Sequence, residues 1–206
     1  MTSRRSSPVS RLRLTGSILV ITSLGAPPDA DDLVHDPVLR QRLRFWRTRD
    51  DAGEVLNVEV WVDPGGGVPP HIHPAMEERF NVVAGRPSFL AGRRWQAAGP
   101  GETVVVPAGT RHAYRNRGDE VAHFVCEARP PSTLQEFLEE TAAFSRAGKI
   151  TRHAIPKPSA LLEAAAMAYR HRAMVTLLFP PMPPPPVQRL VLPALARLGE
   201  RRVGRA

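Results

Sequence analysis

The sequence predicts an all-β domain that is followed by a helical C-terminal extension. Between residues 35 and 129, short stretches of alternating apolar and polar residues are separated by Gly and Pro turn signals, which favours an antiparallel sandwich or barrel. After residue 130 the apolar spacing becomes helical. The 206 residues include 22 Pro and 15 Gly, which disfavours a bundle of long helices. We therefore expect a flexible N-terminal extension at 1–34, a β domain at 35–130 and a helical, Pro-rich extension at 131–206.

The N-terminal extension has the order of regions found in an export signal. Basic residues at 1–13 precede a moderately apolar stretch at 14–26, which ends in small residues. Thr, Ser and Gly interrupt this stretch, and it is shorter than the ~20 residues that a membrane span needs. We expect a cytoplasmic protein without a membrane span. The alternatives for residues 1–30 are export, a disordered leader or one extra edge strand.

The strands of the β domain are predicted from the period-two pattern. At 56–62, four apolar residues alternate with Asn57, Glu59 and Trp61, which predicts a strand with one buried face. Further strands are predicted at 78–83, 87–91, 103–106, 111–115 and 121–127. Turns that contain Gly, Pro or both separate most of these strands, so antiparallel pairing is expected rather than a parallel sheet with crossover helices.

Three helices are predicted in the C-terminal extension, at residues 132–144, 158–169 and 187–198. Ser132 or Thr133 is the expected N-cap of the first helix, with Glu136 placed to assist it. The proline run at 180–186 is predicted to stop any helix and to form an extended linker, although such a run can also be a docking ligand. The last helix has to accommodate Pro193.

The basic charge of the chain lies at its two ends. The formal net charge is +8, from 28 basic and 20 acidic residues. Residues 1–13 hold four Arg and no acid, and residues 189–206 hold five Arg and one acid, which leaves 19 basic and 19 acidic residues between them. A nucleic-acid-binding domain concentrates basic side chains on a folded face, and base stacking needs aromatic residues, which make up only 6% here. We expect no nucleic-acid partner.

The chain has a single cysteine, Cys126. One cysteine excludes an intrachain disulfide and any cysteine-cluster zinc site. Because its neighbours form an apolar predicted strand, we expect Cys126 to be a small buried residue.

Two stretches carry candidate metal-binding chemistry. In residues 65–85, His71 and His73 are two apart, so both imidazoles point to one side of an extended strand, and Glu78 follows. In residues 101–116, His112 lies on a returning strand beyond a Pro-Ala-Gly turn. Three imidazoles and one carboxylate suit one divalent transition metal, namely Mn, Fe, Co, Ni, Cu or Zn, and leave coordination positions open. A His pair alone is more often an ordinary hydrogen-bonded pair.

Together these residues resemble the cupin superfamily. Its motif G(x)5HxH(x)3-4E(x)6G is matched by Gly65, His71, His73, Glu78 and Gly85, and G(x)5PxG(x)2H(x)3N is matched by Gly101, Pro107, Gly109, His112 and Asn116. The resemblance implies a jelly-roll β-barrel with a metal inside it on His71, His73, Glu78 and His112. Glu77 is the competing carboxylate, but only Glu78 stands at the family's distance from Gly85.

Strand parity predicts what lines the pocket. If Glu78 and His112 point inward, Phe80, Val82 and Tyr114 point inward too. Tyr114 is the candidate catalytic residue, as an acid or a donor to a metal-bound substrate; the alternative is a packed tyrosine whose hydroxyl is bonded to the backbone. His123 is either a partner of the metal ligands or an ordinary strand histidine.

The resemblance implies two main functions. The first is an oxidoreductase-like or related enzyme, a dioxygenase, decarboxylase or isomerase that acts on a small oxygen-rich organic substrate. The second is a non-catalytic module that binds or senses a small ligand. A purely structural role is disfavoured, because four inward polar ligands are costly to bury without a metal. The fold alone does not choose between these functions. Pairing through sheet edges would give a homodimer.

Overall fold

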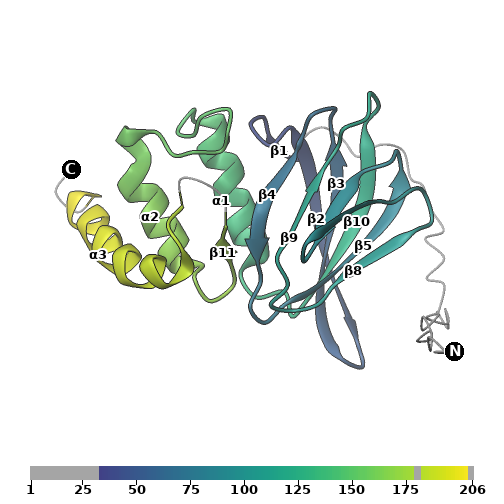
Figure 1. The fold of residues 1–206 in the computed structure, drawn as a ribbon. Coiled ribbons are helices and arrows are strands. Elements are labelled where there is room, and N and C mark those ends of the chain that lie inside the picture. Colours follow the sequence, from purple (N-terminus) through teal and green to yellow (C-terminus); the bar gives the residue numbers. More distant parts are fainter. Residues whose placement is uncertain (1–32, 179–181, 204–206) are drawn as a thin grey trace, which may run out of the picture.

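The computed structural model describes residues 33–178 and 182–203 (Figure 1). The predicted leader, with its alternatives of an export signal or an extra edge strand at residues 1–30, lies outside the described residues. Part of the proline run, at 180–181, also lies outside them.

Two antiparallel sheets form the β domain (Figure 1). The first has the order β1-β2-β3-β10-β5-β8, with bounds Val34–Asp36, Gln41–Asp50, Gly53–Val62, Ala122–Arg129, Glu77–Ala84 and Thr103–Val106. The second has the order β11-β4-β9-β6-β7, with bounds Thr176–Leu177, Gly67–Ile72, His112–Arg115, Ser88–Ala91 and Arg94–Ala97. The all-β prediction is confirmed. Among the described strands no ladder joins the two sheets, so the expected barrel is open rather than closed.

The predicted strands match the structure best where one face is buried throughout. Thr103–Val106 is found as predicted, and the stretch 56–62 is the second part of β3. Strand β2 was missed because the last five of its ten residues are exposed, which leaves little alternation to recognise. Strand β7 was missed too: it has only four residues, all of them exposed, which is too short a stretch for its alternation to be recognised.

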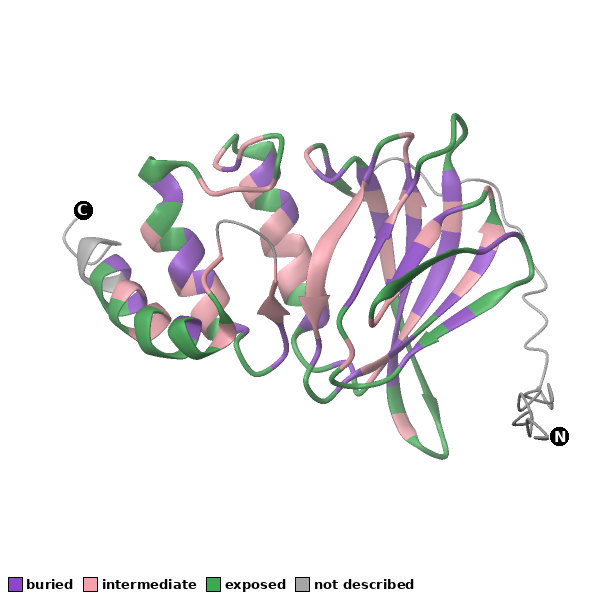
Figure 2. Cartoon of the chain, viewed as in Figure 1, coloured by how far each residue is buried: buried purple, intermediate pink, exposed green. Residues whose placement is uncertain are grey.

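The core lies between the two sheets, where buried and more exposed positions alternate along the strands (Figure 2). Four aromatic rings meet at its centre, with ring centroids 5.0 to 6.4 Å apart; they belong to Phe80, Phe89, Tyr114 and Phe124. Burying a side chain of this size contributes about 1.5–3 kcal/mol to folding. Because Phe80 and Tyr114 follow Glu78 and His112 by two residues, this packing fixes the strands that carry the candidate ligands.

Three α-helices follow the β domain, as predicted: α1 Leu134–Arg146, α2 Leu161–Arg170 and α3 Pro185–Val203. A 3-10 turn at Pro158–Ala160 precedes α2. The prediction that the proline run stops any helix is wrong at its end, because Pro184 O accepts the first helical bond and Pro185 opens α3. Proline fits a first helical turn, whose N–H groups have no helical partner. None of the described helices is long and apolar enough to cross a membrane.

The N-terminus of α1 differs from the expected cap. Thr133 occupies the N-cap position, but neither its side chain nor that of Ser132 caps the helix. The Thr133 hydroxyl instead lies 2.9 Å from Nδ1 of His171, at the end of α2. The side chain therefore joins the two helices rather than satisfying the backbone of α1.

The helical extension is joined to the second sheet through β11. Thr176 and Leu177 pair with Ile72 and His71 of β4, and Leu178 N donates to Pro70 O at 2.9 Å. The Gln188 side chain of α3 donates to Leu177 O at 2.8 Å. The extension is thus hydrogen-bonded to the strand that carries His71, and the helices stack beside this sheet (Figure 1).

Candidate metal centre

Four donor side chains meet between the sheets, and their candidate ligand atoms all lie within 4.8 Å of one another. His71 lies on β4 and His112 opens β9; these strands are neighbours and the two residues are register partners, so their rings stand 4.1 Å apart. His73 follows the end of β4, and Glu78 comes from β5 in the opposite sheet. The predicted grouping of these residues is therefore observed.

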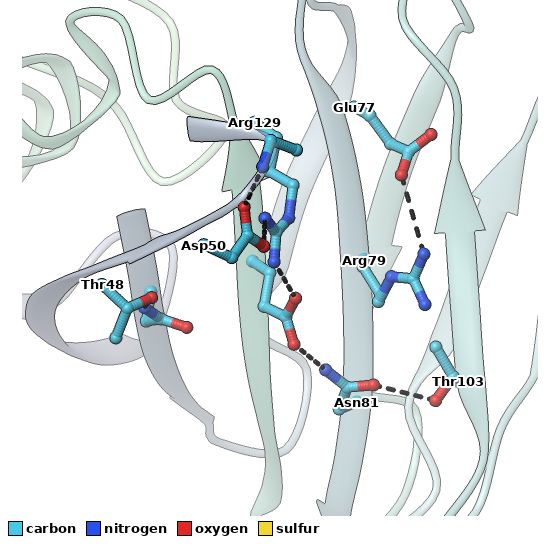
Figure 3. Close-up of polar contacts among 10 residues, drawn as sticks. Thr48, Asp50, Glu77, Arg79, Asn81, Thr103 and Arg129 are labelled. Carbon is cyan, nitrogen blue, oxygen red and sulfur yellow. Dashed lines mark hydrogen bonds and ion pairs between the residues drawn. The ribbon is translucent and has the colours of Figure 1, made fainter. Parts of the chain in front are cut away.

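The two adjacent glutamates point to opposite faces of β5. Glu78 is 6% exposed and faces the histidines. The Glu77 carboxylate lies on the outer face, 3.9 Å from the guanidinium of Arg79 (Figure 3). On the same outer face Asn81 donates to Glu127 at 3.0 Å (Figure 3). Period-two alternation thus separates the candidate ligand from its competitor.

Each of the three imidazoles has its Nδ1 atom against a backbone carbonyl. The pairs are His71 with Pro69 O at 2.9 Å, His73 with Met174 O at 2.9 Å and His112 with Thr110 O at 2.8 Å. A carbonyl only accepts, so each Nδ1 carries the proton and leaves the Nε2 lone pair for another partner. This is how histidine ligands of metals are commonly held.

The Nε2 atom of His73 is buried and makes no hydrogen bond, and the buried Nε2 atom of His112 contacts only the carboxylate of Glu78. They lie 3.6 Å and 2.8 Å from the two carboxylate oxygens of Glu78. Buried polar atoms without a partner are rare, and a cation between the carboxylate and the imidazoles would satisfy all of them. Ligand atoms about 2.1 Å from one metal are at most about 4.2 Å apart, so small side-chain rotations suffice to close the cluster. The donor set therefore fits a metal ion.

The pKa values of three members of the cluster, Glu78, His71 and His73, favour the protonation state that binds a metal. Burial alone would raise the pKa of Glu78, but the surrounding imidazoles outweigh it and lower the pKa to about 2. Burial, aided by the other two imidazoles, lowers the pKa of His71 to about 3, and burial also lowers the pKa of His73. For His112 burial is outweighed by the contact with Glu78, which raises the pKa. At neutral pH the carboxylate is ionised and two imidazoles are neutral.

Tyr114 and Cys126, which lie on strands of the β domain, line the cavity together with the four donors. The Tyr114 hydroxyl donates to Oε1 of buried Gln41, a side chain rather than the backbone that the alternative interpretation named. Burial raises the pKa of Tyr114 well above its usual value, so the hydroxyl keeps its proton. The Cys126 sulfur lies 3.7 Å from Glu78 Oε1, and burial raises the pKa of its thiol. Cys126 is buried as expected, but its contact with a candidate ligand was missed.

Two residues singled out from the sequence lie away from the donors. Val82 is buried in the core, whereas Phe80 and Tyr114 line the cavity in front of the cluster. His123 has its Nε2 atom 2.8 Å from Glu59 and its ring stacked on Trp61. That contact makes His123 an ordinary strand histidine in this structure.

A cavity of about 280 Å³ lies between the cluster and the helical extension. All four donors line it, together with residues from α1, α2 and α3 such as Phe137, Ala165 and Leu192. The sequence analysis assigned no part of the site to the helices. The apolar face of each helix could be recognised in the sequence and indicated that the helix packs against another surface. It did not indicate which surface of the β domain the helix would cover.

Replacing Tyr114 by phenylalanine is expected to lower the free energy of unfolding by about 1–2 kcal/mol, because buried Gln41 would lose its donor. Urea unfolding of Tyr114→Phe measures the loss. Tyr169→Phe is the matched control, since Tyr169 is only partly buried. Equal losses in the two variants would contradict a stabilising role of the Tyr114 hydroxyl.

A family model described as a cupin domain matches residues 58–126, which include all four donors. No curated protein matches the chain significantly. Solved structures that match include the Cupin_2 domain of an XRE family transcriptional regulator from Enterobacter cloacae, with 19% identity, a TM-score of 0.39 and coverage of 45% of this chain and 98% of that chain. The polyketide cyclase RemF from Streptomyces resistomycificus has 28% identity, a TM-score of 0.37 and coverage of 45% and 68%. A sugar phosphate isomerase from a cupin superfamily, from Silicibacter pomeroyi, has 23% identity, a TM-score of 0.38 and coverage of 43% and 59%.

Proposed function

This chain carries a cupin domain at residues 58–126, and from that premise we propose that it is a metal-dependent enzyme. His71, His73, Glu78 and His112 would hold one divalent transition metal, which is Mn, Fe, Co, Ni, Cu or Zn. One observation carries the proposal: three imidazoles, each with Nδ1 on a backbone carbonyl, turn toward a single buried carboxylate. The substrate is a small organic molecule with oxygen donors, and the reaction is a dioxygenation, a decarboxylation or an isomerisation.

A bound divalent ion would supply a Lewis acid with open coordination positions. The chain itself supplies orientation and exclusion of water. The three carbonyls hold the imidazoles in one tautomer, and the helical extension covers the cluster. Tyr114 lies two residues after His112 on β9 and lines the cavity with its proton in place. We assign it the role of a hydrogen-bond donor, or acid, toward a substrate oxygen, which requires the hydroxyl to leave Gln41.

A second candidate function is a non-catalytic module that binds or senses a small ligand. Apart from the four donors, the titratable side chains that line the cavity within the described chain are Tyr114 and Cys126. Both have raised pKa values, so neither serves as a base near neutral pH. An enzyme of this kind would depend on the metal and on Tyr114, whereas a binding module would need nothing further.

Elemental analysis followed by turnover assays tests the proposal. We expect about one equivalent of transition metal per chain as purified. Metal-loaded protein is then incubated with a panel of small enols, thiols and hydroxy acids, with dioxygen uptake and product formation as readouts. Turnover of a panel member supports an enzyme, and binding of some without turnover of any supports the module. Protein that takes up no metal from any of the six ions would contradict both.

We also propose a homodimer that pairs through sheet edges. The supporting observation is β7, an edge strand of the second sheet whose residues are all exposed. Light scattering is expected to give twice the mass of the chain, and a monomer at micromolar concentration would contradict the pairing.

A further inference from the structure

We propose that the ligand of this site carries its oxygen donors at one end and an apolar body at the other, and that the helical extension selects the apolar body. The inference rests on the proposed function for the end that meets the metal. It concerns the opposite end of the cavity, which the cupin motifs do not reach.

The wall opposite the donors is apolar. Helix α1 contributes Phe137, Leu138 and Phe144, and α2 and α3 contribute alanines, leucines and Met167. Within the described chain no lysine, arginine or aspartate lines the cavity, and Glu78 is its single carboxylate. Charged and hydroxyl-rich ligands would therefore meet hydrocarbon over most of their surface.

The few other polar side chains of the wall are already hydrogen-bonded within the protein. Cys126 donates to Glu78, Thr141 to Phe137 O and Gln188 to the carbonyls of Leu177 and Pro183. Tyr114, which donates to Gln41, lies two residues after His112 and so belongs to the metal end of the cavity. A ligand hydroxyl placed there would give up its bonds to water without gaining an equivalent partner. The sequence analysis expected an oxygen-rich substrate. The cavity restricts this expectation to substrates whose oxygen atoms all lie at the end that meets the metal.

The size of the cavity limits the size of the ligand. A volume of about 280 Å³, at about 30 Å³ for each heavy atom as in liquid water, holds on the order of ten heavy atoms.

The metal end and the apolar wall of the cavity are connected by a hydrogen bond, because Met174 O, just before β11, accepts from Nδ1 of His73. The segment of the extension around Met174 thus orients His73 and also leads into the helices that form the apolar part of the cavity, which we call the chamber.

The binding affinities of a homologous series of n-alkyl hydroxamic acids, from two to twelve carbons, measure the length and the apolar character of the chamber on the metal-loaded protein. Calorimetry is expected to show affinity rising about fourfold per methylene up to about seven carbons, where the chamber is full, and levelling or falling beyond. The hydroxamate of a six-carbon sugar acid, which has the same head and a polar body, is expected to bind no better than acetohydroxamate. Affinity that is independent of chain length, or binding of no member, would overturn the inference.

A substitution in the wall provides the matched test. Ala165 lines the chamber from α2 and is 5% exposed, whereas its neighbour Ala166 does not line it. Ala165→Leu is expected to weaken the seven-carbon hydroxamate at least tenfold and acetohydroxamate by less than twofold. Ala166→Leu, with the same change in helix propensity, is expected to change neither. Circular dichroism melts establish that both variants fold; equal effects of the two would overturn the assignment of the wall.

The series also separates this inference from the proposed function when metal content is measured first. Dependence on chain length in protein that takes up no metal would support the apolar chamber and contradict the metal centre. Fully loaded protein that binds all chain lengths equally would contradict the chamber and leave the metal centre intact.

Discussion

Replacing His112 by alanine is expected to weaken metal binding about a hundredfold or more. His112 supplies one of three imidazoles, and its Nε2 atom stands 2.8 Å from Glu78, on the side where a cation would be held. A metal that binds only the folded state stabilises it by about 2.7 kcal/mol at a hundred times its dissociation constant, so the variant is also expected to lose this stabilisation. Metal content after purification and the thermal midpoint with added metal are the two measurements.

His153→Ala is the matched control for His112→Ala, because His153 is exposed and lies outside the cluster. The control is expected to keep the metal content and the metal-dependent thermal shift of the wild type. Undiminished metal in His112→Ala would show that these four side chains do not act as one site.

Acidification of the metal-free protein is expected to remove on the order of 3 kcal/mol of stability between pH 6.5 and 4.5. The pKa of His71 falls from 6.5 to about 3 on folding, because burial and the neighbouring imidazoles disfavour its charge. As the pH drops through 6.5 the unfolded chain binds a proton that the folded chain does not, so protons favour unfolding. The lowered pKa of His73 acts in the same direction.

The other two members of the cluster modify this acid loss. The raised pKa of His112 opposes it, because protonation of His112 favours the folded state. Glu78, with its pKa lowered from 4.5 to about 2, adds a further loss only below pH 4.5. Urea unfolding at several pH values measures the slope, and His71→Gln is expected to make it shallower between pH 6.5 and 4.5. An identical slope in the variant would contradict an uncharged imidazole at position 71 in the folded state.

The candidate ligands could be predicted from the sequence because they stand at the spacings of the two cupin motifs, and the resemblance to that family implies that the motifs meet at one site. Two residues two apart on a strand share a face, which groups His71 with His73 and separates Glu78 from Glu77. His112 follows a Pro-x-Gly turn and opens β9, which pairs with β4 and places His112 opposite His71. The alternation of side chains along a strand acts over a few residues, so it can be read from the spacing of residues in the sequence.

The remaining features of the site depend on contacts between distant parts of the chain. Met174, whose carbonyl orients His73, lies 101 residues away from it, and Gln41 lies 73 residues from Tyr114. Strand β11 has two residues, too few for a period to be recognised. The apolar helix faces were visible in the sequence, but that they would close a chamber over the cluster was not. Long-range packing therefore builds the substrate side of the site and also orients His73 on the metal side, whereas local spacing decides only which face of its strand each candidate ligand occupies.

Anomalous diffraction from crystals of the metal-loaded protein, recorded at the absorption edge of the bound metal, tests the central claim most directly. The account predicts one strong peak inside the β domain, about 2.0–2.3 Å from Nε2 of His71, His73 and His112 and from a carboxylate oxygen of Glu78. A peak at another place on the protein, or a peak bound by only one of these side chains, would contradict it.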